Sequence, residues 1–188
     1  MQPFAGPSLP AAMNPDTLTP SLPAAQGSRI LLQQGIRTLG QLSATQYAGA
    51  RDGHSSAGSQ FRHILDHYAA LFDGIREGRV NYDARRRDRA IEHDPSVAAA
   101  EAQRWINALD QLEVPDGEHR LLVHSDSGGG PDCSDWRESS IGRELQFLAS
   151  HTVHHYALIK LLLEWHGVSM DRAFGMAPST RAHLAGTR

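Results

Sequence analysis

Apolar residues recur at helical spacing in the first part of the chain. From Ile30 to Leu42 they follow one another at intervals of two to four residues, which predicts an amphipathic helix beginning near Gln26. Two glycines weaken this helix, because glycine loses more backbone entropy than other residues on becoming helical. A loop is expected at residues 52–56.

A second apolar face, Phe61–Ile75, predicts a longer helix. Ser55 or Ser56 could act as its N-cap, since a serine hydroxyl can accept a backbone N–H of the first turn. Gly78 follows as a typical helix stop. The charged stretch Val80–Asp94 shows no such periodicity and is expected to be a loop.

Two further helices are expected in the second half of the chain. Asp94 opens the third helix, with Pro95 at the first helical position, where its missing N–H costs nothing, and the helix runs to about Leu112. The last and longest helix covers Ile141–Trp165, and the serines at 139–140 are its candidate caps.

The segment between these two helices has a different pattern. His119–Ser125 and Cys133–Arg137 are interpreted as two short strands, joined by a flexible turn at glycines 128–130. After the last helix, residues 174–180 form a short apolar segment rich in turn-forming residues.

Four helices with short connections predict an all-α fold, an antiparallel four-helix bundle with a short hairpin or irregular insertion before the last long helix. Residues 26–180 form a single domain in this interpretation. Six prolines interrupt residues 1–25, which are expected to be disordered, and residues 181–188 are expected to be a tail.

Composition narrows the possible functions. The 188 residues are enough for one domain with a hydrophobic core, and a net charge of -3 does not favour nucleic-acid binding. No apolar run approaches the roughly 20 residues of a membrane-spanning helix, and the sequence begins without the pattern of a signal peptide. The expected location is therefore the cytoplasm, with the single Cys133 as an incidental thiol.

The histidines carry the most chemical information, and the chain has eleven of them. His151 and His155 lie one turn apart in the last helix, close enough to bind one ion together. They belong to a stripe with steps of three and four residues whose members, apart from the histidines and one glutamate, are leucines, so it is expected to face the core. Its members are Glu144, Leu148, His151, His155, Leu158 and Leu162.

Spacing alone is weak evidence, because random placement of the histidines gives roughly 0.6 pairs one turn apart. The second helix carries another pair, His63 and His67, and its helical wheel favours His67 as the inward residue. A buried imidazole needs a hydrogen bond or a metal ion. The pairs could share one metal ion, or they could be solvent-flanking histidines beside one hydrogen-bonded core histidine.

Two segments resemble a known family. Ser56–His67 reads SAGSQFRHILDH and Arg143–His155 reads RELQFLASHTVHH. Together with Tyr82–Asp88 (YDARRRD) and the segment FGMAPST at 174–180, they resemble the DinB/YfiT-like superfamily of bacterial four-helix metalloproteins. The resemblance extends over about residues 28–180.

This resemblance implies a metal site made of three histidines. They are His63, seven residues after Ser56, together with His151 and His155. His67 could be a fourth ligand or a proton-transfer residue, since it shares one side of its helix with His63.

Two carboxylates are candidates for the surroundings of such an ion. Glu144 or Asp66 could orient a ligand from the second layer, and Glu144 could act as a general base. A surface or capping role is the alternative for each. Three imidazoles accept Zn, Ni, Fe or Mn, which the sequence does not distinguish.

The resemblance also implies a reaction class. Related proteins use a metal ion to activate a low-molecular-weight thiol for transfer to an electrophile, or act in hydrolysis or isomerisation, so a small-molecule substrate is expected. Family members of this type are often dimers, so a homodimer is expected as well. Arg85, Arg86, Arg87 and Arg89 could hold an anionic group, or could lie in a solvated loop. The alternative function is a non-catalytic metal-binding or stress-related interaction bundle.

Overall fold

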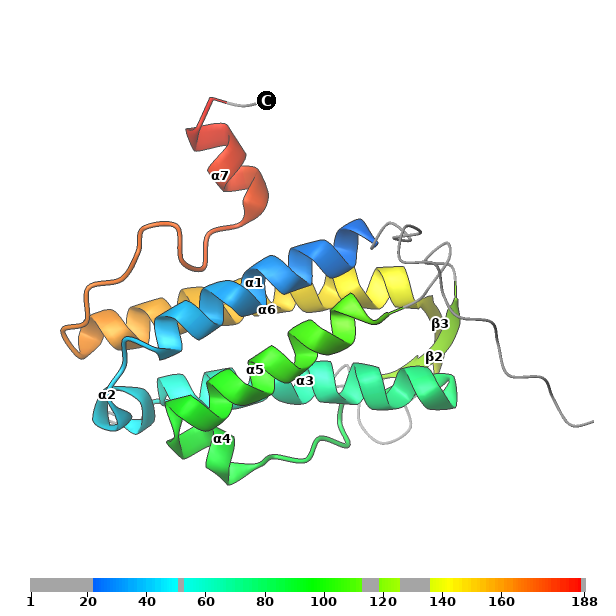
Figure 1. Ribbon diagram of the computed structural model, residues 1–188, viewed down its shortest axis with the longest axis horizontal. Helices are drawn as coiled ribbons and strands as arrows, with labels where there is room; N and C mark the ends of the chain where they lie inside the picture. Colours follow the sequence, from blue (N-terminus) through cyan, green and yellow to red (C-terminus); the bar gives the residue numbers. More distant parts are fainter. Residues whose placement is uncertain (1–21, 51–52, 113–118, 126–135, 187–188) are drawn as a thin grey trace, which may run out of the picture.

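The computed structural model describes residues 22–50, 53–112, 119–125 and 136–186. Within these ranges the chain is mostly helical and also forms one small sheet (Figure 1). The helices are α1 (Pro23–Leu39), α2 (Ala44–Ala48), α3 (Ala57–Glu77), α4 (Arg89–His93), α5 (Pro95–Asp110), α6 (Ile141–Trp165) and α7 (Pro178–Leu184). The strands are β1 (Arg79–Asn81), β2 (Arg120–His124) and β3 (Arg137–Ser140).

The four long helices α1, α3, α5 and α6 pack side by side. Helix α1 contacts α5 and α6, and α3 contacts the same two helices. In Figure 1, α1 and α6 run in one direction and α3 and α5 in the other, so only α1–α5 and α3–α6 are antiparallel neighbours. The fully antiparallel arrangement expected from the sequence is wrong, because residues 78–94 carry the chain back to the start of α3 before α5 begins.

A three-stranded sheet in the order β1-β2-β3 corrects the all-α prediction. Strand β2 pairs antiparallel with β3, which confirms the hairpin expected before the last helix. The expected second strand began at Cys133, but residues 133–135 lie outside the described part, and β3 begins at Arg137. Strand β1 pairs parallel with β2, Val80 beside Val123, in a stretch expected to be a loop.

The helix caps predicted from the sequence are confirmed for the three long helices α3, α5 and α6. The Ser56 hydroxyl accepts the N–H of Ser59 at the start of α3, and α3 ends at Gly78, whose φ of 71° is left-handed. Ser140 caps α6 and Asp94 caps α5 in the same way. These residues satisfy backbone groups that a helix end leaves without partners.

The remaining differences concern the ends and short helices. Helix α1 begins at Pro23, three residues before the expected start, so residues 23–25 are helical, whereas residues 1–21 of the expected disordered segment lie outside the described part. Helices α2, α4 and α7 were not predicted, because five to seven residues are too few to show a helical period. Helix α7 includes residues 181–184 of the expected tail and has no buried residue.

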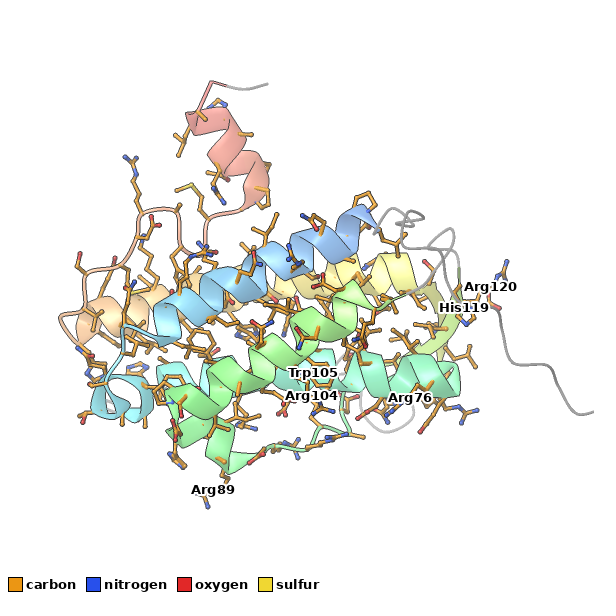
Figure 2. All side chains as sticks on the ribbon, in the orientation of Figure 1. Arg76, Arg89, Arg104, Trp105, His119 and Arg120 are labelled. Carbon is orange, nitrogen blue, oxygen red and sulfur yellow. The ribbon has the colours of Figure 1, made fainter. Side chains whose placement is uncertain are left out.

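Large side chains from the long helices fill the space between them. Tyr68 of α3 and Tyr156 of α6 are fully buried. Trp105 of α5, which is labelled in Figure 2, stacks on Phe72 of α3 with ring centroids 5.3 Å apart. Among the described residues, none of the helices has the length and apolar character that crossing a bilayer requires.

Two helical glycines should respond to alanine in opposite directions. A Cβ at Gly58 would overlap the Glu92 carbonyl oxygen, where α4 lies against the start of α3, whereas a Cβ at Gly27 of α1 meets nothing within 4 Å. We expect Gly58→Ala to lower the free energy of unfolding by about 1–3 kcal/mol. Gly27→Ala should raise it by about 0.5–1 kcal/mol through helix propensity. Denaturant unfolding checks both, and equal effects would contradict the close α3–α4 contact.

Candidate metal centre

Four histidine side chains meet between α3 and α6. His63 and His67 come from α3, and His151 and His155 come from α6. The ring centroids of neighbouring pairs are 4.3 to 5.0 Å apart. The one-turn spacing on each helix, together with the contact between the helices, brings both histidine pairs to one place.

Three of the four histidines offer a set of metal ligands. One nitrogen from each of His63, His151 and His155 lies within 4.8 Å of the other two, and the Nε2 atoms of His63 and His151 are 3.0 Å apart. Nitrogens around a tetrahedral ion at about 2.0–2.1 Å are roughly 3.4 Å apart. By distance alone, small side-chain rotations would bring these nitrogens around one ion, so the donor set fits a divalent metal once the proton of His63 leaves Nε2.

The histidines of α6 lie at the edge of the core rather than inside it. Leu148 is buried, but His151 and His155 are half-buried, and so are Leu158 and Leu162 further along the stripe. The stripe was expected to face the core, and this is correct only for its first part. The deeply buried face is the neighbouring one, formed by Leu145, Leu148, Thr152, Tyr156, Ile159 and Leu163. An ion at the edge of the core can be reached by a substrate.

His67 is buried, with 6% of its surface exposed, which confirms the inward position predicted by the helical wheel. Its Nδ1–H donates to the carbonyl oxygen of His63 at 2.8 Å, one turn back in α3. This hydrogen bond leaves Nε2 as the atom with a free lone pair. The ring lies 4.3 Å from that of His151 between centroids, and its role as fourth ligand or proton carrier stays a prediction.

Gln60 orients His155 from the opposite helix. The two residues form a hydrogen bond of 2.6 Å, in which His155 Nδ1–H donates to Oε1 of Gln60. Donation from Nδ1 leaves the Nε2 lone pair available for an ion, which is the usual way a polar neighbour prepares a histidine ligand. Gln60 was not predicted as a site residue, although it lies three residues before His63, on the same side of α3.

Arg85 makes the corresponding contact with His63. Its Nη1 donates to Nδ1 of His63 at 2.7 Å, so that nitrogen accepts a hydrogen bond. In this tautomer the proton of His63 is on Nε2, which faces Nε2 of His151. Arg85 had been grouped with the neighbouring arginines, and its sequence position did not distinguish it from them.

Glu144 reaches the histidines through Tyr82. Its carboxylate is buried and accepts hydrogen bonds from the hydroxyls of Tyr82 at 2.8 Å and Ser139 at 2.5 Å. The ring of Tyr82 stacks on His67, with centroids 5.3 Å apart. Burial and the charge of Glu144 raise the pKa of Tyr82, so the hydroxyl remains a donor. Tyr82 thus lies between Glu144 and the imidazole of His67.

Asp66 makes no hydrogen bond to the four histidines among the described contacts, and its role in the second layer stays a prediction. It is buried and pairs with Arg62 one turn earlier, at 3.4 Å, and it also accepts the backbone N–H of Arg87. Burial raises the pKa of its carboxyl. Its carboxylate also acts on the charge of Arg85, which contacts His63, so Asp66 supports the segment that carries Arg85 and Arg87.

The pKa values of all four imidazoles are lowered. Burial is the largest cause in each case, and the positive charge of Arg85 lowers all four values further. For His67 the hydrogen bond to the His63 carbonyl acts in the opposite direction. The pKa of His63 falls to about 2, and those of His67, His151 and His155 fall to about 4. Neutral imidazoles are the form that binds a metal ion.

An apolar cavity of about 600 Å³ lies beside this group. Its lining residues come from the end of α6, the start of α3 and the segment before α3. They are His54, Ser55, Gln60, Leu158, Leu161, Leu162, Glu164 and Trp165. Gln60 connects the cavity to His155. The volume falls within the roughly 300–1,000 Å³ usual for sites that bind small molecules.

Comparison with known proteins leaves the family of the chain open. No family model matches it, and no solved structure matches it. It is similar to FK506-binding protein 5 of the fungus Rhizopus delemar, with 35% identity over 111 residues. The match covers 56% of this chain but only 27% of that protein, so the chain spans about a quarter of the length of this curated relative.

The lowered pKa values predict a dependence of stability on pH. The unfolded histidines titrate near 6.5, whereas the folded ones stay neutral down to about 4 or below. As the pH falls through this window the unfolded chain binds protons that the folded chain does not, so the free energy of unfolding decreases. Above 6.5 these groups add no slope.

Denaturant unfolding in the presence of a chelator, from about pH 7.5 to about pH 5, measures this slope. His151→Gln should make it shallower by about one proton. A slope unchanged by this substitution would contradict the neutral, buried state of the group.

The hydrogen bond between Tyr82 and Glu144 predicts an energetic coupling. We expect Tyr82→Phe to lower the free energy of unfolding by about 1–3 kcal/mol, because it removes a donor from a buried carboxylate. In a Glu144→Gln background the same substitution should cost less, since the acceptor is no longer charged. A double-mutant cycle by denaturant unfolding measures the difference, and additive effects would argue against the bond.

Proposed function

We propose that the chain is a divalent-metal-dependent enzyme of the DinB/YfiT-like superfamily that activates a low-molecular-weight thiol or water for transfer or hydrolysis. The observation that carries this proposal is the set of three imidazole nitrogens, from His63, His151 and His155, within 4.8 Å of one another. These are the three residues that the family motif assigns to the metal.

The arrangement of the long helices supports the same assignment. A four-helix bundle is the fold that the resemblance implies, and α1, α3, α5 and α6 pack together as four long helices around one core. The serine of the motif, Ser56, caps α3 and so sets the helical phase that directs His63 toward α6. The small sheet is then an addition at one end of the bundle.

Three neutral imidazoles leave at least one coordination position for a reactant, which is the pattern of catalytic rather than structural sites. When bound, Zn, Ni, Fe or Mn would lower the pKa of a thiol or water there. Gln60 keeps Nε2 of His155 available, and the buried His67, whose ring centroid lies 4.3 Å from that of His151, is the candidate proton acceptor. The chain thus provides both the ligands and a group that accepts a proton.

The surroundings suit a small-molecule substrate. The cavity beside Gln60 offers an apolar surface next to His155, and a net charge of -3 does not favour nucleic acid as partner. A homodimer in the cytoplasm completes the proposal. Leu161 and Trp165, which are 63% and 55% exposed, lie at the mouth of the cavity and are candidates for contact with substrate or with a second copy.

Metal analysis tests the first step. Protein purified without a histidine tag should bind about one divalent ion per chain after reconstitution. His155→Gln should weaken binding at least roughly tenfold, because it removes a ligand. His154→Gln is the matched control, an exposed histidine one position earlier on the same helix, and should bind like the wild type. Equal binding by both variants, or none by the wild type, would refute the metal site.

Turnover then separates catalysis from a structural ion. The loaded protein should accelerate the reaction of low-molecular-weight thiols with an electrophile such as 1-chloro-2,4-dinitrobenzene, or the hydrolysis of small esters and amides. His155→Gln should abolish this rate. A metal that raises the melting temperature without any turnover would instead favour the non-catalytic metal-binding bundle.

A further inference from the structure

Arg85 differs from the other arginines of its segment. It is half-buried, whereas Arg86, Arg87 and Arg89 are exposed, and Arg89 points away from the helices in Figure 2. Its Nη1 contacts His63, and its charge acts on all four imidazoles of the site. This guanidinium therefore belongs to the histidine group.

The backbone around Arg85 is held in an unusual conformation. Arg87 has a φ of 53°, a left-handed value that costs energy for a residue other than glycine. Asp66 of α3 accepts the backbone N–H of Arg87, and Asp73 of α3 pairs with the side chain of Arg86. These two contacts with α3 fix Arg86 and Arg87. Arg85 lies in the chain between strand β1 and these two residues, and its side chain contacts the histidines.

The donors of Arg85 are only partly used. A guanidinium has five N–H donors, yet the Nε of Arg85 is buried without a hydrogen-bond partner among the described residues. The bond to His63 is also a poor match for a metal site. An ion on Nε2 requires the proton of His63 on Nδ1, and Nδ1 would then no longer accept from Arg85.

The positive charges at the site also favour an anionic ligand. A divalent ion held by the histidines would stand beside the positive guanidinium, and the two would repel each other in a half-buried place. A carboxylate offsets both charges and matches the planar fork of arginine, accepting two parallel hydrogen bonds. The carboxylate of Asp66 acts on Arg85 but is itself buried, and a neutral ligand would add no further compensating charge.

We propose that Arg85 binds a carboxylate of the substrate, and that the metal-dependent reaction therefore acts on carboxylate-bearing small molecules. This inference rests on the proposed function and adds the substrate class to it. When the histidines hold an ion, the guanidinium of Arg85 releases its hydrogen bond to His63 and donates to the carboxylate instead. Asp66 has a positioning role, because it fixes the loop that carries Arg85.

Two thiols of equal chain length test the proposal. Calorimetric titration of the Zn²⁺-loaded protein compares 3-mercaptopropionate, which has a carboxylate, with 3-mercapto-1-propanol, which has a hydroxyl. We expect the wild type to prefer the carboxylate roughly tenfold or more, the value of a charge-assisted hydrogen bond. Arg85→Gln should lose this preference. Arg86→Gln, the exposed neighbour, should keep it.

Zn²⁺ titration without a thiol gives a second readout. Arg85→Gln should bind Zn²⁺ several-fold more tightly than the wild type, because it removes both the repulsion and the competing hydrogen bond. If thermal unfolding finds that Arg85→Gln is not folded, Arg85→Lys replaces it. Lysine keeps the charge but not the fork, so it should reduce the preference several-fold.

The outcomes separate this inference from the proposed function. A wild type that binds Zn²⁺ but does not distinguish the two thiols overturns the role of Arg85 and leaves the metal site intact. A preference retained by the Arg85 variant, or lost equally in Arg86→Gln, overturns it as well. If the wild type binds no metal, the proposed function fails, and the inference fails with it.

Discussion

The contact between α3 and α6 puts four imidazole rings into a half-buried space in which a positive charge is disfavoured. The other features of the site follow from this constraint. The polar nitrogens of buried, neutral rings still need partners, and the chain supplies them nearby. Gln60 accepts from His155, the backbone of α3 accepts from His67, and Arg85 donates to His63. Burial and the charge of Arg85 thus keep the rings neutral, and the hydrogen bonds fix which nitrogen of each ring carries the proton.

The small sheet supports the second layer of the site. Strand β1 follows α3 almost directly, and its parallel register with β2 continues in the hydrogen bond from the Tyr82 N–H to the carbonyl of His124. Tyr82 is thereby held with its ring against His67 and its hydroxyl on Glu144. The strand that corrected the all-α prediction therefore contributes to the position of a buried carboxylate.

Local features of the fold could be predicted from the sequence. The boundaries of α3 and α6 depend on caps such as Ser56 and Ser140 and on apolar periods that extend over many residues, so they are encoded in short windows. Strand β1 has three residues and depends on a partner about 40 positions away, which no local pattern reveals. The direction of neighbouring helices was missed for the same reason.

The residues of the candidate site also differ in whether a local pattern identifies them. One-turn spacing identified both histidine pairs, and the wheel correctly placed His67 inward. Gln60 could have been found by extending the stripe of His63 by one turn. Arg85 could not, because its direction depends on the left-handed Arg87 and on the contact of that residue with Asp66, both set by tertiary structure.

The separation of the site residues along the chain has a consequence for the order of assembly during synthesis. His63 and His151 are 88 positions apart, and α6, which carries two of the histidines, packs against α1 as well as α3. A nascent chain that ends before α6 has neither the complete core nor more than one of the three candidate ligands. Bringing residues so far apart in the chain together costs conformational entropy, so the contact between α3 and α6 is expected to form late in folding. The candidate site therefore forms only after the last long helix has been made, because a partly synthesised chain lacks two of its three histidines.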